Sequence, residues 1–132
     1  IDFESSKCAE MDGLKCVYIT PHNTPIELNL EINDYDTIST AVKGLIEITH
    51  PFDDSVSIIG NEEAKLINME GNRRVGNGIY AGPILIVGDN GGEDFIGLTQ
   101  EQADRYMDMF EQPEEITDEE VQADTGCTIY FM

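Results

Sequence analysis

The sequence predicts a single α+β domain, with a mixed or mostly antiparallel sheet of about five strands and two or three helices. Three observations support this fold class. Residues 26–32 alternate between apolar and polar side chains, residues 84–87 are uninterruptedly apolar, and residues 99–102 have the form of a capping box that opens a helix. A length of 132 residues with 40% hydrophobic content suffices for one domain with a buried core.

The first two strands are predicted to form a hairpin. Residues 14–20 are rich in β-branched and aromatic side chains, and the turn-forming residues 21–25 separate them from the alternating segment. One face of the second strand is apolar, and it consists of Ile26, Leu28, Leu30 and Ile32. Residues 1–12 show no sustained periodicity, so we expect an N-terminal extension before a domain that spans residues 13–112.

A short helix is predicted after the hairpin. Asp34 or Asp36 can cap its N-terminus, apolar residues recur at helical spacing up to about Lys43, and Gly44 ends it. Two further strands are expected next, at residues 45–49 and 55–59.

The second half of the domain begins with a glycine-rich segment, residues 71–78, which predicts a loop. Residues 84–87 are the best candidate for a central strand, and residues 88–93 predict another loop. The helix from Thr99 to about Phe110 has an apolar stripe formed by Ala103, Tyr106, Met107 and Phe110.

Residues 113–132 are predicted to form an acidic C-terminal segment. Residues 117–120 have the form of a second capping box, which predicts a short helix. Residues 127–131 are apolar enough for an edge strand or a docked tail.

Charge is the most asymmetric property of the chain. Twenty-seven acidic residues against seven Lys and Arg give a formal net charge of -20, which repels phosphate backbones and anionic lipid. We therefore expect no direct nucleic-acid binding and no membrane association, and a basic protein is the expected kind of partner. The three cysteines are odd in number and lack zinc spacing, so we interpret them as free thiols in a reducing, cytoplasmic compartment.

Four motifs occur in an order that resembles a known family. They are IIGNEEAKL at residues 58–66, the pair Asn72 and Arg73, AGPILIVG at residues 81–88, and DFIGLTQEQ at residues 94–102. Together they resemble the domain-of-unknown-function family DUF3846 over about residues 14–110. Ala64 and Gly97 depart from the family pattern, which usually has Gly and often Ser there. The resemblance implies a bacterial, phage or plasmid setting, often near antirestriction and conjugation genes, and no assigned activity.

One candidate ligand site is a dense polar set that follows the strand ending near residue 60. It comprises Asn61, Glu62, Glu63, Lys65, Asn72 and Arg73. Carboxylates beside basic groups can bind a polar ligand or perform acid–base chemistry if burial shifts their pKa values. The alternative interpretation is a solvated turn in which Asn61 caps the chain and Arg73 pairs with Glu62 or Glu63.

A candidate protein-interaction surface lies between residues 89 and 124, where thirteen carboxylates accompany Arg105 as the only basic residue. Its residues are Glu101, Asp104, Asp108, Glu111, Glu114, Glu115, Asp118, Glu119 and Glu120. Carboxylates three or four residues apart on a helix are about 5–6 Å apart and can imitate the charges of nucleic acid. The alternative is that every helix of so acidic a protein exposes carboxylates.

Motifs for catalysis and cofactors are absent from the sequence. We find no Ser-His-Asp order, Walker motif, zinc spacing or dinucleotide-binding glycine pattern, so no catalytic residue, cofactor or metal is predicted. Residues 89–94 are rich in oxygen ligands but do not fit the EF-hand spacing, and they are interpreted as a plain loop. His22 and His50 are interpreted as exposed or structural.

These observations favour a non-catalytic interaction module of a bacterium or mobile element. An antirestriction or nucleic-acid-mimicking role is the specific form of this hypothesis. The alternative is a ligand-binding or enzymatic domain with its site between Asn61 and Arg73. The oligomeric state is left open.

Overall fold

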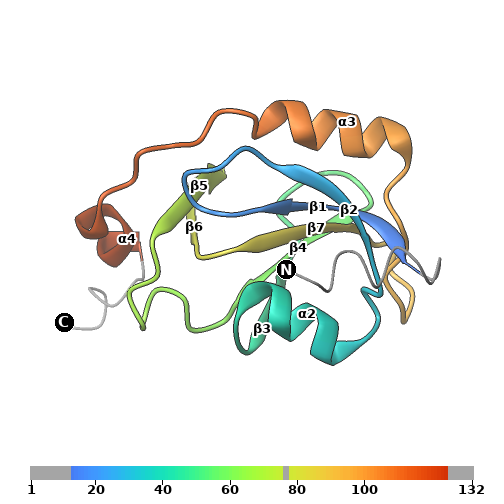
Figure 1. Cartoon of the computed structure of the whole chain (residues 1–132), viewed down its shortest axis with the longest axis horizontal. Coiled ribbons are helices and arrows are strands. Elements are labelled where there is room, and N and C mark those ends of the chain that lie inside the picture. The colour runs from blue at the N-terminus through green and yellow to red at the C-terminus, as the bar shows by residue number, and fades with distance from the viewer. Residues whose placement is uncertain (1–12, 76–77, 125–132) are drawn as a thin grey trace.

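The computed structural model describes residues 13–75 and 78–124, and it contains a five-stranded antiparallel sheet (Figure 1). The strand order is β2-β1-β7-β4-β3. The strands are β1 (Leu14–Ile19), β2 (Ile26–Leu30), β3 (Ile46–Thr49), β4 (Val56–Asn61) and β7 (Ile84–Gly88). The predicted α+β class is confirmed, and residues 84–87 do form the central strand.

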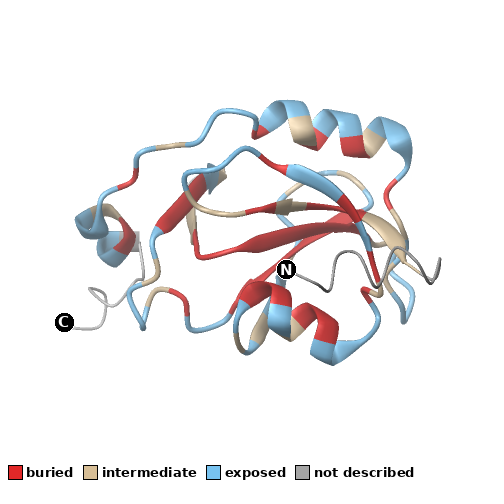
Figure 2. Ribbon diagram, in the orientation of Figure 1, coloured by how far each residue is buried: buried red, intermediate tan, exposed pale blue. Residues whose placement is uncertain are grey.

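Helices cover both faces of this sheet. Helix α2 (Tyr35–Val42) lies on one side and helix α3 (Gln100–Met109) on the other, as Figure 1 shows. Successive residues of β1 therefore face different cores: Cys16 belongs to the cluster under α2, and Val17 to the cluster under α3. Strands β4 and β7 are buried along their whole length (Figure 2). The apolar run 84–87 is explained by this burial on two faces.

The helix ends follow the capping residues. Asp34 caps α2 by accepting a hydrogen bond from the Thr37 backbone N–H at 3.0 Å. Lys43, with φ 68°, ends the helix in the left-handed conformation one residue before the predicted Gly44. Thr99 and Gln102 form the expected capping box of α3. Thr117 and Glu120 form the other, at the start of α4 (Asp118–Asp124).

The glycine-rich segment differs from its prediction. Most of it is a two-stranded antiparallel ribbon of β5 (Gly71–Val75) and β6 (Gly78–Ala81), where a loop was expected. Gly71 serves packing here, because a Cβ added to it would lie 2.7 Å from the Cβ of Ile116. The glycine content indicated a loop, but the close approach of the C-terminal segment also requires glycine at position 71.

The acidic C-terminal segment docks against this ribbon. Its Ile116 and Val121 are buried with Ala64 and Ala81 in a small separate cluster. Among the described residues of the segment, the helix is confirmed. The predicted extension at residues 1–12 and the predicted strand at 127–131 lie outside the described residues. Within residues 13–75 and 78–124, no helix has both the length and the apolar character needed to cross a bilayer.

Candidate functional site

Asn61, the last residue of β4, joins this strand to the end of α2. Its Nδ2 donates to the carbonyl oxygens of Val42 and Lys43, both at 3.1 Å, and its Oδ1 accepts from the Glu63 backbone N–H at 2.7 Å. Asn61 is buried, so these bonds satisfy groups that water does not reach. Its side chain is therefore committed to holding the fold.

Asn72 and Arg73 lie in β5, where both side chains are buried. Asn72 Nδ2 donates to the carbonyl oxygens of Ile19 at 3.0 Å and Gly82 at 2.8 Å. Arg73 donates to backbone carbonyl oxygens of three segments, including that of Phe110 after α3. The predicted ion pair between Arg73 and Glu62 or Glu63 is not formed, because the guanidinium points into the interior and these two carboxylates are exposed.

Part of the polar set borders a different feature, a cavity of about 490 Å³ beside β3 and β6, whereas Glu63 is exposed and does not line it. Asn61, Glu62 and Lys65 line it together with Glu47 and Tyr80. Neither Asn72 nor Arg73 is among its lining residues. The six predicted residues therefore do not converge on one site: Asn72 and Arg73 are buried apart from the cavity, Asn61, Glu62 and Lys65 line it, and Glu63 is exposed outside it.

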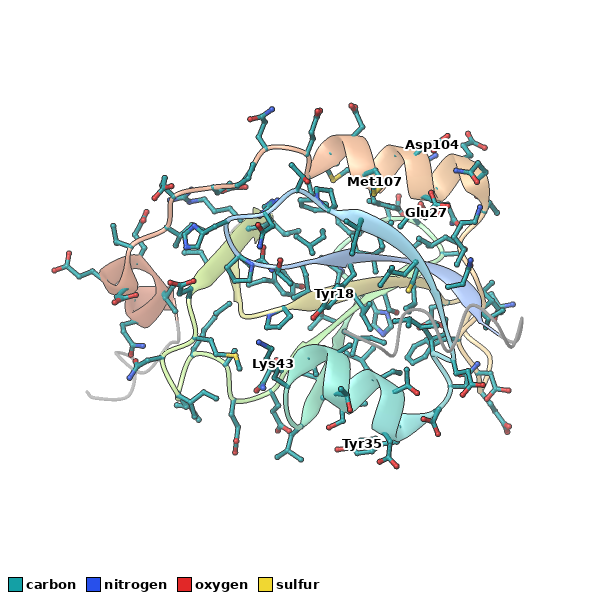
Figure 3. The ribbon with its side chains drawn as sticks, in the orientation of Figure 1. Tyr18, Glu27, Tyr35, Lys43, Asp104 and Met107 are labelled. Carbon is teal, nitrogen blue, oxygen red and sulfur yellow. The ribbon has the colours of Figure 1, made fainter. Side chains whose placement is uncertain are left out.

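The carboxylates of α3 take part in a second hollow, which we call the acidic groove. It has a volume of about 470 Å³ and is lined by Thr24, Pro25, Glu27, Asp104, Met107, Asp108 and Glu111. Figure 3 shows Glu27 and Asp104 close together near Met107, between β2 and α3. Sequence reasoning found Asp104, Asp108 and Glu111 but missed Glu27, because only the strand arrangement brings β2 beside the helix.

Several of the other predicted surface carboxylates pair with basic side chains. Glu101 lies 3.8 Å from Arg105, and Arg74 pairs with Glu114 at 3.0 Å and with Glu120 at 2.6 Å. Glu27 itself is 3.6 Å from the ammonium of Lys15. Glu115, Asp118 and Glu119 are exposed on or before α4. The predicted surface is therefore divided between the acidic groove, the carboxylates that pair with Arg105 and Arg74, and the exposed carboxylates on or before α4.

Asp54 anchors α3 to the loop before β4. It accepts hydrogen bonds from the Tyr106 hydroxyl and from Arg105, both at 2.7 Å, and from Gln102 at 3.2 Å. The Tyr106 bond, aided by the Ser55 backbone N–H, Gln102 and Arg105, holds the pKa of Asp54 below its ordinary value despite partial desolvation. The ionised form of Asp54 is thus the one that stabilises the helix position.

Replacing Asp54 with asparagine is expected to lower the free energy of unfolding at neutral pH, with a difference from wild type that shrinks in acid. Because the folded-state pKa is depressed, the stabilisation is present above the unfolded value of about 3.9 and is lost as the pH falls through the folded value. Urea unfolding of both proteins at pH 7 and at about pH 3 measures this. Asp53→Asn, which removes the same charge from an exposed neighbour, should remain close to wild type at pH 7; a pH-independent D54N deficit would contradict the mechanism.

A serine, a histidine and an aspartate also meet at the ends of three neighbouring strands. Ser57 Oγ lies 2.7 Å from His50 Nδ1 and donates to Asp89 Oδ2 at 2.6 Å. In a catalytic triad the histidine takes the serine proton and the aspartate orients the histidine. Here the serine hydroxyl binds the aspartate directly, and Ser57 is fully buried, so it cannot attack a substrate. No sequence signal linked these positions, since strand pairing alone assembles them.

In the loop after β7, side-chain oxygens accept hydrogen bonds from the loop's own backbone N–H groups. Asp89 Oδ1 accepts from the Gly91 N–H at 3.0 Å, and Asn90 Oδ1 from the Gly92 N–H at 3.1 Å. Among the residues that the structure describes, no group of three or more His, Cys, Asp or Glu is placed to hold a metal. Burial raises the pKa of the Cys16 thiol to about 12, which leaves it protonated and unreactive. Cys8 and Cys127 lie outside the described residues.

Comparison with known proteins identifies the family. The model of the family described as "Domain of unknown function (DUF3846)" matches residues 14–111, which is most of the chain. No curated protein and no solved structure shows significant similarity. The chain therefore belongs to the DUF3846 family, as the order of its motifs predicted, and this family carries no assigned activity.

Proposed function

We propose that this DUF3846 protein is a non-catalytic interaction module that binds a basic protein partner at the acidic groove. The observation that supports this function best is the convergence of four carboxylates on one hollow: one from β2, two from α3 and one from the segment just after α3. Its lining residues include no Lys or Arg. A groove lined by charge of one sign concentrates the electrostatic field and accelerates the approach of an oppositely charged protein.

The groove also offers apolar contact. Met107 is partly exposed and Pro25 is buried, and both line the hollow between the carboxylates. A lysine or arginine side chain has an apolar stem and a charged end, so it can pack on Met107 while its cation reaches Asp104 or Asp108. This combination favours a protein ligand with projecting basic side chains over a simple metal cation.

A nucleic-acid-binding protein is the natural candidate partner within this proposal. Asp104 and Asp108 are four residues apart in α3, so these two carboxylates lie about 5–6 Å apart on one side of the helix, and Glu111 follows just after the helix ends. Such a row imitates the regular charges of a phosphate backbone. We extend the proposal to the setting that the family resemblance implies: a bacterial or mobile-element protein that acts in the cytoplasm against a restriction or other defence protein.

The second candidate function is a small-ligand site at the cavity beside β3 and β6. Its volume of about 490 Å³ is within the usual range for ligand pockets. However, the most strongly basic residue of the predicted site, Arg73, is buried elsewhere and donates to carbonyl oxygens. This leaves the acidic groove as the better supported site.

Charge reversal at the groove tests the proposed function. The variant Asp104→Lys, Asp108→Lys, Glu111→Lys is compared with Asp36→Lys, Asp53→Lys, Glu93→Lys, in which the same change of net charge is made at exposed positions that line neither hollow. The probe is a fluorescent nona-arginine peptide, titrated by anisotropy at about 50 and 300 mM salt. We expect the groove variant to bind about tenfold more weakly than the control at low salt, with a smaller difference at high salt.

Equal affinities of the two variants would contradict a localised field and support an evenly spread acidic coating. Circular dichroism and urea unfolding of both variants establish that the fold is retained. A native-like spectrum with lost binding in the groove variant alone is the result that supports the proposal.

A further inference from the structure

Strand β3 forms an edge of the sheet, and its outward backbone groups are available. The Glu62 N–H donates to the Leu45 carbonyl oxygen at 2.8 Å. This bond fixes the phase of the β3–β4 ladder, in which Glu47 pairs with Gly60 and the hydrogen-bonded pairs alternate with non-bonded ones. The backbone N–H and C=O groups of Ile46 and Ile48 consequently point away from β4. Among the described residues, β4 is the only strand that pairs with β3.

Within residues 13–75 and 78–124, this edge carries none of the usual protection against strand addition. Natural sheet edges carry proline, lysine, bulges or a covering segment. Strand β3 has the sequence Ile-Glu-Ile-Thr, with regular pairing and no proline or lysine. Ile48 is 43% exposed, Leu45 beside it 50%, and Leu66 at the neighbouring cavity 75%. Leu45 and Ile48 therefore meet solvent beside backbone groups that no described residue pairs, and Leu66 meets solvent at the cavity.

The two faces of β3 differ in the side chains that an added strand would meet. Ile46 faces the α2 side, where it packs against the core, and Ile48 shares this face. Glu47 and Thr49 face the cavity, whose lining includes Glu47 and Glu62 as acids and Lys65 as the basic residue. Side chains of an incoming strand alternate in the same way, so apolar residues fit beside Ile46 and Ile48, and a basic residue fits beside Glu47.

A second copy of the chain fits this edge poorly. Two molecules with a formal charge of -20 each repel one another, and the acids at the cavity would face acids of the same kind. A segment with alternating apolar and basic residues has the complementary charge.

We propose that β3 binds an extended apolar–basic segment of a partner protein as a sixth strand of the sheet. Main-chain hydrogen bonds to Ile46 and Ile48 supply the pairing, and the alternating side chains supply the specificity. The site is separate from the acidic groove and does not depend on it.

The test titrates the fluorescent peptide acetyl-Val-Lys-Val-Lys-Val-Lys-Val-amide against the Asp104→Lys, Asp108→Lys, Glu111→Lys variant, so that the acidic groove does not take up the basic peptide. Two N-methylated versions are compared with it, one methylated on the three Val amides that follow a lysine and one on the three Lys amides. In an antiparallel addition the valines lie opposite Ile46 and Ile48 and form the hydrogen bonds, whereas the lysine amides face solvent. Methylation of Val is expected to weaken binding about tenfold or more, and methylation of Lys much less. In a parallel addition the two expected effects are exchanged, because the Lys amides then face β3 and the Val amides face solvent.

A protein variant gives the matching control. Ile48→Pro removes an outward N–H without removing a bond to β4, and proline is tolerated on edge strands. In the Asp104→Lys, Asp108→Lys, Glu111→Lys background, which leaves β3 as the remaining proposed site, we expect Ile48→Pro to keep the fold, measured by circular dichroism, and to lose the peptide. The background variant without Ile48→Pro should keep the peptide at β3. Amide chemical shifts should move at residues 45–49.

Three results would overturn the proposal. The two methylated peptides could bind equally well or equally poorly, the shifts could fall outside β3, or folded I48P in the groove-variant background could bind as the groove variant alone does. Concentration-dependent dimerisation that I48P abolishes would assign the edge to a second copy instead. Failure here leaves the groove proposal standing, because the groove variants report on it separately.

Discussion

Replacement of Arg73 with alanine is expected to lower the free energy of unfolding by about 3–5 kcal/mol, a large part of the total stability of a domain of this size. The Arg73 side chain is fully buried. Its removal leaves several buried carbonyl oxygens without a donor, each at a cost of about 1–3 kcal/mol, and creates a cavity as well.

The contacts of Arg73 explain why the effect should spread. Its Nε and Nη2 donate to the Phe110 carbonyl oxygen at 3.2 and 2.9 Å, and Nη2 donates to that of Asn23 at 2.6 Å. Nη1 donates to the carbonyl oxygen and to Oδ1 of Asn72, at 3.1 and 3.0 Å. One guanidinium therefore joins the ribbon, the turn between β1 and β2, and the end of α3. Burial lowers the Arg73 pKa, but an arginine stays charged at neutral pH.

Urea unfolding of three variants measures this effect. Arg73→Lys keeps a cation with fewer donors in a different geometry and should fall between wild type and R73A. Arg74→Ala removes the exposed neighbour, whose ion pairs with Glu114 and Glu120 are screened by solvent, and should be far milder. If R73A and R74A unfolded at the same urea concentration, the central role of the buried guanidinium would be wrong.

The elements that local chemistry specifies were predictable from the sequence. Alternation revealed β2, the unbroken run 84–87 revealed β7, and the Thr99–Gln102 box located the start of α3. Each signal lies within one segment, where side-chain spacing and capping determine the local structure. The order of motifs also identified the family, because order along the chain is itself a sequence property.

Long-range contacts were not predictable in the same way. Arg73 was expected in a solvated turn beside Glu62, yet its partners lie 37 and 50 positions away in the chain. Glu27 joined the acidic groove only through the packing of α3 over β2. An arginine reads the same in the sequence whether its side chain is buried against carbonyl oxygens or exposed to bind a ligand. Only the structure shows which of the two applies.

Asn61 gives the second large effect, and two substitutions separate its roles. Asn61→Ala removes both donors and the acceptor, and it is expected to cost about 2–3 kcal/mol of unfolding free energy because buried groups at the end of α2 lose their partners. Asn61→Asp keeps an acceptor for the Glu63 N–H but directs an anionic oxygen at the carbonyl oxygens of Val42 and Lys43, both of which now receive a donor at 3.1 Å.

We therefore expect N61D to be less stable than N61A at neutral pH, although it is the closer match in shape. Protonation of the new carboxyl relieves the repulsion between oxygens, so N61D should recover stability relative to N61A as the pH falls. Thermal unfolding of both variants at pH 7 and about pH 4 measures how the stability of N61D changes relative to that of N61A. If N61D equalled wild type at pH 7, the Asn61 amide would have to face the opposite way from the arrangement described.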